Sequence, residues 1–277
     1  MSRNRKPEAF QGSEAELRAL TAQVDEVHRA TLPHMYAAAA ELSEQIREPS
    51  RATAAMSEPA LDRRRFLRGV GVVGLSAFAL AACSSDNGKS STPSTPTAPG
   101  SGQAAPAAGT YTGDLLVVAL AVALENQAVG AYQAAVQAAG AGKLGTVPPA
   151  VANFATTAMA QHADHAKVWN NVLTQAGKPP ITGVPLKSQA AVADALGKVT
   201  DIPGVARLAL QLEDQAAQTY LFAEFNVTAP AGIETAATIA PVEAMHAATL
   251  HYLLGEYPVP ADFLPVDKAA KTDDLTV

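Results

Sequence analysis

Histidines and acidic residues recur in the second half of the chain at spacings that suit metal binding. Two pairs stand three residues apart, His162 with His165 and Glu243 with His246. Residues three apart share one face of a helix, so both members of a pair can reach the same ion. Two further carboxylates stand alone in apolar segments, where a buried charge needs a partner or a metal. We therefore predict a metal site built from Glu125, His162, His165, Glu213, Glu243 and His246.

The two single carboxylates belong to an internal repeat. Residues 120–132 and 208–220 are identical at seven of 13 positions, including a glutamate, a glutamine and a terminal tyrosine. At about 100° per residue, Glu125 and Glu213 each lie on the same apolar stripe as the tyrosine of their repeat, so both are expected to point into a core. Candidates for hydrogen bonds to the ligands are Tyr132 and Tyr220, on these stripes, and Asp164, which lies off the inward face.

Proline, glycine and capping residues divide residues 112–256 into four helices, followed by a C-terminal tail at 257–277. The predicted helices run from Asp114 to Ala139, from Thr146 to Gly177, from Asp201 to Phe225 and from Pro230 to Gly255. The connection over 178–200 is much longer than the others, with a short helix expected at 188–196. These lengths predict an all-α four-helix bundle of two equivalent hairpins, with one long crossover between the second and third helices. Pro241 is expected to kink or break the last helix.

This arrangement of ligands resembles the ferritin-like di-metal carboxylate proteins, which carry one glutamate on two helices and a pair ending in histidine on the other two. The resemblance covers residues 112–256 and implies one or two ions, iron or manganese first and zinc as an alternative. His162 departs from the family pattern, which has glutamate there. Three carboxylates balance two divalent ions less well than four, and imidazole widens the choice of metal. A single ion, an asymmetric pair or no metal at all therefore remain open.

Residues 62–82 carry the features of a bacterial export signal. Twin arginines precede a 14-residue apolar stretch at 69–82, which is too short to span a bilayer. The sequence L-A-A-C at 80–83 then resembles a lipobox, whose cysteine is acylated and becomes the mature N-terminus. The twin-arginine motif R-R-x-F-L consists of Arg63, Arg64, Phe66 and Leu67, and the predicted lipid attachment site is Cys83.

Combined with the helical domain, this signal resembles that of the bacterial ferritin-like lipoproteins exported by the twin-arginine (Tat) pathway. The resemblance implies a protein held by fatty acyl chains, such as palmitate, on the extracytoplasmic face of the cell membrane. Its partners would be the membrane, the Tat translocase and the lipoprotein-processing enzymes. Two acyl chains on one cysteine are enough for stable anchoring.

The segments on either side of the signal have different expected roles. Residues 84–111 are rich in Ser, Thr, Pro, Gly and Ala and are expected to form a flexible tether. Residues 1–61 are unusual, because an export signal normally begins near the N-terminus. Either translation starts at Met56, which is favoured because it gives an ordinary signal, or residues 1–61 are a cytoplasmic extension that is lost on processing. Residues 14–48 are expected to be helical, with a break at Pro33.

Composition narrows the function further. After Cys83 the chain carries nine basic and 16 acidic residues, so no nucleic-acid partner is expected. A single cysteine excludes a disulfide framework and a Cys-rich metal site. No run of 18 apolar residues is present, and no ordinary membrane-spanning helix is expected. His28 and His34 precede the export signal and are left out of the predicted mature site.

Three functions fit these features. The first is a metal-dependent oxidoreductase that acts on O₂ or peroxide at an iron or manganese site. The second is a protein that handles metal ions at the cell envelope without catalysis. The third is a metal-free helical module for interactions. The first two need the same ligands, so the sequence does not separate them, and it leaves the oligomeric state open.

Overall fold

The computed structural model describes residues 13–55, 106–107, 109–259 and 265–277. The export signal, Cys83 and most of the predicted tether lie outside the described residues. Within these ranges the chain is all-α, as predicted, and its only β-structure is one isolated bridge between Leu186 and Leu275. The helices are α1 (Glu14–Ala55), α2 (Asp114–Gly140), α3 (Pro149–Gln175), α4 (Gln189–Lys198), α5 (Ile202–Asn226), α6 (Pro230–Leu253) and the 3₁₀ helix η2 (Thr272–Asp274).

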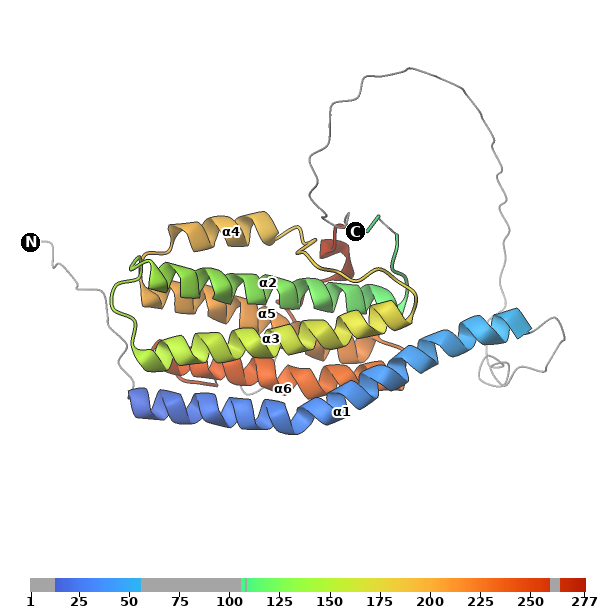
Figure 1. The fold of residues 1–277 in the computed structure, drawn as a ribbon, viewed down its shortest axis with the longest axis horizontal. Helices are drawn as coiled ribbons and strands as arrows, with labels where there is room; N and C mark the ends of the chain where they lie inside the picture. The colour runs from blue at the N-terminus through green and yellow to red at the C-terminus, as the bar shows by residue number, and fades with distance from the viewer. Residues whose placement is uncertain (1–12, 56–105, 108, 260–264) are drawn as a thin grey trace, which may run out of the picture. The chain divides into compact units, whose positions relative to one another are not determined.

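Helices α2, α3, α5 and α6 form the predicted four-helix bundle (Figure 1). α2 packs mainly against α3 and α5 mainly against α6, so the bundle consists of two hairpins that meet where α2 contacts α5. The long connection between α3 and α5 contains α4 as its short helix. Asp201 caps α5 by accepting a hydrogen bond from the Gly204 amide at 2.8 Å, as the sequence predicts. Gly177 and Gly255 follow α3 and α6 with positive φ, a conformation that favours glycine.

The apolar core of the bundle lies in two clusters, one on each side of the predicted ligand level. One cluster includes Val122, Trp169 and Ile239, and the other includes Phe154 and Leu250. α2 is long and apolar enough to cross a membrane by length and composition, but 67% of its most apolar window is buried inside the bundle. Its burial identifies it as a core helix, which explains why it is so apolar.

Two prolines lie inside helices, Pro33 against expectation and Pro241 within the predicted last helix. The predicted break at Pro33 is wrong, because α1 runs continuously from Glu14 to Ala55 and only bends along its length (Figure 1). α6 likewise continues through Pro241 without breaking. A proline in a helix interior costs about 3 kcal/mol. Both helices are packed against others on either side of the proline, and that packing offsets the cost.

α1 lies antiparallel to α6 and spans its length. At one end the Ser13 amide donates to the Tyr252 hydroxyl at 2.9 Å, close to the C-terminus of α6. At the other end Gln45 accepts a hydrogen bond from the amide of Ala231, in the first turn of α6, at 3.4 Å. The part of α1 up to Ser50 belongs to the same compact unit as the bundle. The chain therefore adds a fifth long helix to the expected four.

The C-terminal tail is also part of this unit. The Ala270 amide donates to the Thr219 hydroxyl of α5 at 2.8 Å. Leu275 then forms its bridge with Leu186 in the crossover, and both side chains are buried. The tail therefore covers α5 and fixes part of the long connection.

Candidate metal centre

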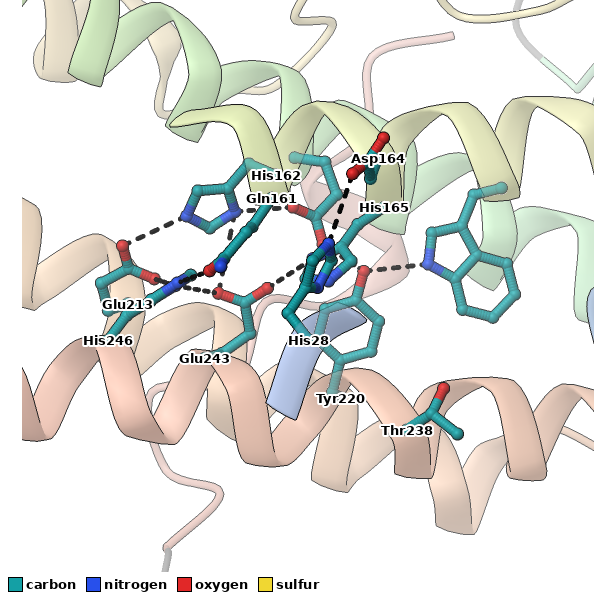
Figure 2. A network of polar contacts seen from close by, with 12 residues as sticks. His28, Gln161, His162, Asp164, His165, Glu213, Tyr220, Thr238, Glu243 and His246 are labelled. Atoms are coloured by element: carbon teal, nitrogen blue, oxygen red, sulfur yellow. Dashed lines mark hydrogen bonds and ion pairs between the residues drawn. The ribbon is translucent and has the colours of Figure 1, made fainter. Parts of the chain in front are cut away.

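All six predicted ligands meet at one level of the bundle (Figure 2). Each of the four bundle helices supplies at least one of them, with two from α3 and two from α6. No ligand exposes more than 2% of its surface. Whether they hold metal stays a prediction, but the arrangement that metal binding requires is present. The residues are Glu125, His162, His165, Glu213, Glu243 and His246.

His162 lies between the two glutamates of the internal repeat. Its Nδ1 is 2.7 Å from Oε2 of Glu125, and its Nε2 is 3.1 Å from Oε1 of Glu213. The two ring nitrogens therefore face opposite carboxylates. Whichever nitrogen carries the proton, the other can accept a hydrogen bond or bind a metal.

Glu243 also faces two partners. Its Oε1 is 2.8 Å from Nδ1 of His165, and its Oε2 is 3.2 Å from Nδ1 of His246. Candidate ligand atoms fall into two groups of four, each with all its atoms within 4.8 Å of one another. Both groups contain His162 and Glu243; one adds Glu125 and His165, and the other adds Glu213 and His246. The site is thus two adjacent half-sites that share two residues.

Several polar atoms at this level lack a hydrogen bond, which is the observation that fits a metal. Both ring nitrogens of His165, Oε2 of Glu213 and Oε1 of Glu243 are buried with no hydrogen-bond partner among the described residues. The His165–Glu243 contact is close, but the two groups are not aligned for a hydrogen bond. Buried polar groups are nearly always satisfied. Imidazole and carboxylate are also the ligands that iron, manganese and zinc take up in proteins.

Charges in this cluster balance without metal. Burial by itself would raise the pKa of Glu125, but His165 and His162 outweigh it and hold the pKa at about 2. Burial would also raise the pKa of Glu213, but His162 and His246 hold it well below its usual range. Burial would lower the pKa of His165, but Glu125 and Glu243 raise it to about 9. The nearby carboxylates likewise outweigh burial and raise the pKa of His162 and His246.

These shifts predict how the stability of the metal-free protein depends on pH. A histidine whose pKa rises from 6.5 unfolded to about 9 folded stabilises the fold fully below pH 6.5, and this contribution is lost as pH rises through 9. For His165 the loss amounts to as much as about 3 kcal/mol. We expect the melting temperature of metal-free protein to fall by roughly 5–10 °C between pH 6 and pH 9.

A bound metal should change this pH profile, because it requires neutral imidazoles and its affinity therefore grows with pH. The increase in melting temperature on adding metal should be larger at pH 9 than at pH 6. Calorimetry with and without metal at pH 6 and at pH 9 measures this increase at each pH. The titration of surface groups cancels, because it affects the protein equally with and without metal. An increase that shrinks toward pH 9 would contradict the assigned charges.

Each of the two repeat tyrosines forms a hydrogen bond with the glutamate of the other repeat. Tyr132 of α2 donates to Oε1 of Glu213 at 2.5 Å, and Tyr220 of α5 donates to Oε1 of Glu125. Trp169 donates in turn to the Tyr220 hydroxyl at 2.9 Å. Burial and the neighbouring carboxylates raise the pKa of both tyrosines well above 10. Each tyrosine therefore remains a protonated donor and orients the carboxylate of the other hairpin.

The other predicted neighbours lie farther out. The side chain of Asp164 is 43% exposed, and its partner is His28 of α1, with Nε2 and Oδ2 3.3 Å apart. His251, near the C-terminus of α6, pairs with Glu256 at 2.8 Å. The repeat glutamine Gln127 bonds to Ser188 and Gln189 in the crossover and not to a ligand.

Sequence reasoning missed three residues that surround the ligands. Gln161 accepts a hydrogen bond from Nε2 of His246 at 2.6 Å and donates to Asp25 of α1 at 3.4 Å. The ring of His28 packs edge-on against that of His165, with centroids 5.1 Å apart. Asp25 and His28 are three residues apart, so the spacing rule used for the ligands could have found them. His28 is left out of the predicted site because it precedes the export signal, and Asp25 is not among the predicted candidates.

Comparisons with known proteins agree with this architecture. No curated protein and no solved structure matches the chain. Residues 102–256, more than half of the chain, match the model of the ferritin-like domain family. That range includes the four bundle helices and all six predicted ligands. The chain therefore belongs to the ferritin-like domain family, with buried histidine and glutamate groups that could bind metal.

Proposed function

We propose that this protein is an exported, membrane-anchored ferritin-like protein that binds one or two metal ions within its bundle. The proposal of metal binding rests on the buried candidate ligand atoms that lack a hydrogen-bond partner at one level of the core. Glu125 and His165 would hold an ion in one half-site, and Glu213 and His246 would hold one in the other. His162 and Glu243 are available to both half-sites.

The free space beside the ligands bears on whether the protein is an enzyme. A cavity of about 10 Å³ between α2 and α5 reaches Glu125 and His162. A cavity of that size holds about one water molecule. Such a space leaves no room for a bulky substrate at the ligands. Iron or manganese bound there would supply one-electron chemistry, and only redox substrates as small as O₂ or peroxide are compatible with so little free space.

Within such a site, the protein's own residues would fix protons and orientation. Tyr132 and Tyr220 donate hydrogen bonds to the two single glutamates and so hold these carboxylates in place. The two apolar clusters on either side of the ligand level exclude water from the bundle axis. A protein that only handles metal would need the same features, so turnover with peroxide has to be measured directly.

Metal analysis of the protein purified from the membranes of cells that make and export it tests the first proposal. We expect iron or manganese at one to two equivalents per chain. Refolded protein is unsuitable, because it would take up whichever metal is in excess. Protein that carries no metal, and whose melting temperature is unchanged by iron, manganese and zinc, would instead favour a metal-free interaction module.

Export and anchoring rest on the signal motifs and have their own test. We expect Cys83→Ala to leave the precursor uncleaved or to release the protein from membranes. Arg63→Lys with Arg64→Lys should block export, because the translocase recognises the arginine pair. Fractionation followed by mass spectrometry of the N-terminus measures both effects. Arg65→Lys, at the variable position of the motif, is the matched control, and full-length wild-type protein found in the cytosol would refute the proposal.

A further inference from the structure

The inward face of α1 covers the metal centre. Its buried side chains recur three and four residues apart, which gives the helix one continuous inward stripe. The stripe is apolar at Leu17, Val24 and Met35 and polar at His28, and all four are 3% exposed or less. Thr21 and Ser43 are also buried on it, but their hydroxyls bond carbonyls of α1 itself, whereas the partner of His28 lies in α3. A helix that only sealed the bundle would carry apolar residues here, because burying a polar group without a partner costs free energy.

One polar contact from α1 reaches the half-site of His246. Asp25 can only accept, so it receives the amide proton of Gln161 and thereby orients that amide. The Gln161 carbonyl oxygen then points at Nε2 of His246, 2.6 Å away, and accepts a hydrogen bond from its N–H group. With the proton held on Nε2, the Nδ1 atom faces Glu213 at 3.4 Å and Glu243 at 3.2 Å. Asp25 thus selects, through Gln161, the nitrogen of His246 that is offered to a metal.

A second contact from α1 reaches the other half-site. The Nε2 atom of His28 lies 3.3 Å from Asp164, which fixes the orientation of the imidazole (Figure 2). The ring of His28 then packs edge-on against that of His165, at an interplanar angle of 63°. His165 has no hydrogen bond of its own to hold it among the described residues. Its orientation therefore depends on its ion pair with Glu243 and on packing, to which His28 contributes directly.

We propose that Asp25 and His28 are positioning residues of the metal centre, one for each half-site, so that α1 completes the centre. This inference rests on the metal binding proposed above. Contacts of this kind fix the tautomer and orientation of a ligating histidine. It also gives residues 14–48 a function in the translated chain. Cleavage before Cys83 removes both contacts, so α1 acts on the centre in the precursor, before the anchored form is made. A chain that began at Met56 would never have them.

Cobalt titration of the full chain tests the proposal, because the visible absorption of Co²⁺ reports its coordination. The variants are Asp25→Ala, which removes the acceptor for Gln161, and His28→Gln, which removes the imidazole. We expect each to weaken Co²⁺ binding roughly tenfold or more and to change the spectrum. Asp25→Asn keeps an oxygen that can accept the same hydrogen bond, so it should restore most of the affinity and the wild-type spectrum.

Matched controls come from the same helix. Glu26 is the exposed neighbour of Asp25, and His34 is an exposed histidine paired with Glu234. Glu26→Ala and His34→Gln should leave both affinity and spectrum unchanged. Circular dichroism of each metal-free variant checks that the helices are retained.

The outcomes separate this inference from the function on which it rests. If the wild-type chain binds no Co²⁺, the proposed metal function fails and this inference fails with it. If the wild type binds Co²⁺ but Asp25→Ala and His28→Gln keep its affinity and spectrum, metal binding stands and only the positioning role is refuted. Variants that merely melt earlier, with an unchanged spectrum, would likewise show that α1 serves stability alone.

Discussion

Replacing Glu213 with alanine is expected to abolish the stabilisation that an ion bound in the half-site of Glu213 and His246 confers on the protein. A ligand present at 100 times its dissociation constant stabilises the folded state by about 2.7 kcal/mol. For a domain of this size, that raises the melting temperature by roughly 5–10 °C. Glu213 is 1% exposed and one of its oxygens has no hydrogen-bond partner among the described residues. Its removal takes a negative charge and a ligand from one half-site.

Calorimetry with and without metal measures this effect, and the comparison must be made within each variant. Glu213→Ala also destabilises the metal-free protein, because His162 and His246 lose a carboxylate that faces them at 3.1 and 3.4 Å. Glu234→Ala is the matched control, since that glutamate lies on the surface of α6 and pairs with His34. It should retain the full increase on adding metal. If metal raised the melting temperature of Glu213→Ala as much as that of wild type, Glu213 would not be a metal ligand.

His162→Glu should convert the centre to the family pattern and favour a second ion. The substitution places a fourth carboxylate between Glu125 and Glu213, where the imidazole now faces both. Without metal, three clustered carboxylates at this position repel one another, so the metal-free variant should melt earlier than wild type. With metal, the added charge compensates two divalent ions better than the histidine does. The gap between the melting temperatures with and without metal should therefore widen.

Isothermal titration with Fe²⁺ or Mn²⁺ under anaerobic conditions gives the number of ions bound. We expect wild type to bind the second ion weakly or not at all, and His162→Glu to bind two. His162→Gln is the control, because it is similarly polar but adds no charge, and it should not gain an ion. If the stoichiometry of His162→Glu equals that of wild type, position 162 does not limit the number of metals.

The helices and the set of residues that meet at the candidate metal centre were predictable from the sequence because both depend on local rules. Proline in the first turn, glycine after the last turn and a capping aspartate define where helices α3, α5 and α6 begin and end. The three-residue spacing and the apolar stripes then indicate which histidines and carboxylates face inward. Glu125 and Glu213 occupy equivalent positions in the internal repeat, which predicts that the two hairpins are equivalent. These features require only the geometry of a single helix.

Only the tertiary structure decided which side chains of different helices bond to each other. The two tyrosines point inward by sequence, but packing makes each bond the glutamate of the other repeat. The continuous α1 and α6 show that packing overrides the preference of proline to end a helix.

The contacts of α1 depend on tertiary structure most of all. Asp25 and His28 lie more than 130 residues before their partners in α3. No local pattern specifies which face of one helix lies on which face of another, because that choice is made by shape and polarity across the whole interface. The sequence therefore determined which residues meet at the candidate centre, and packing determined what surrounds and orients them.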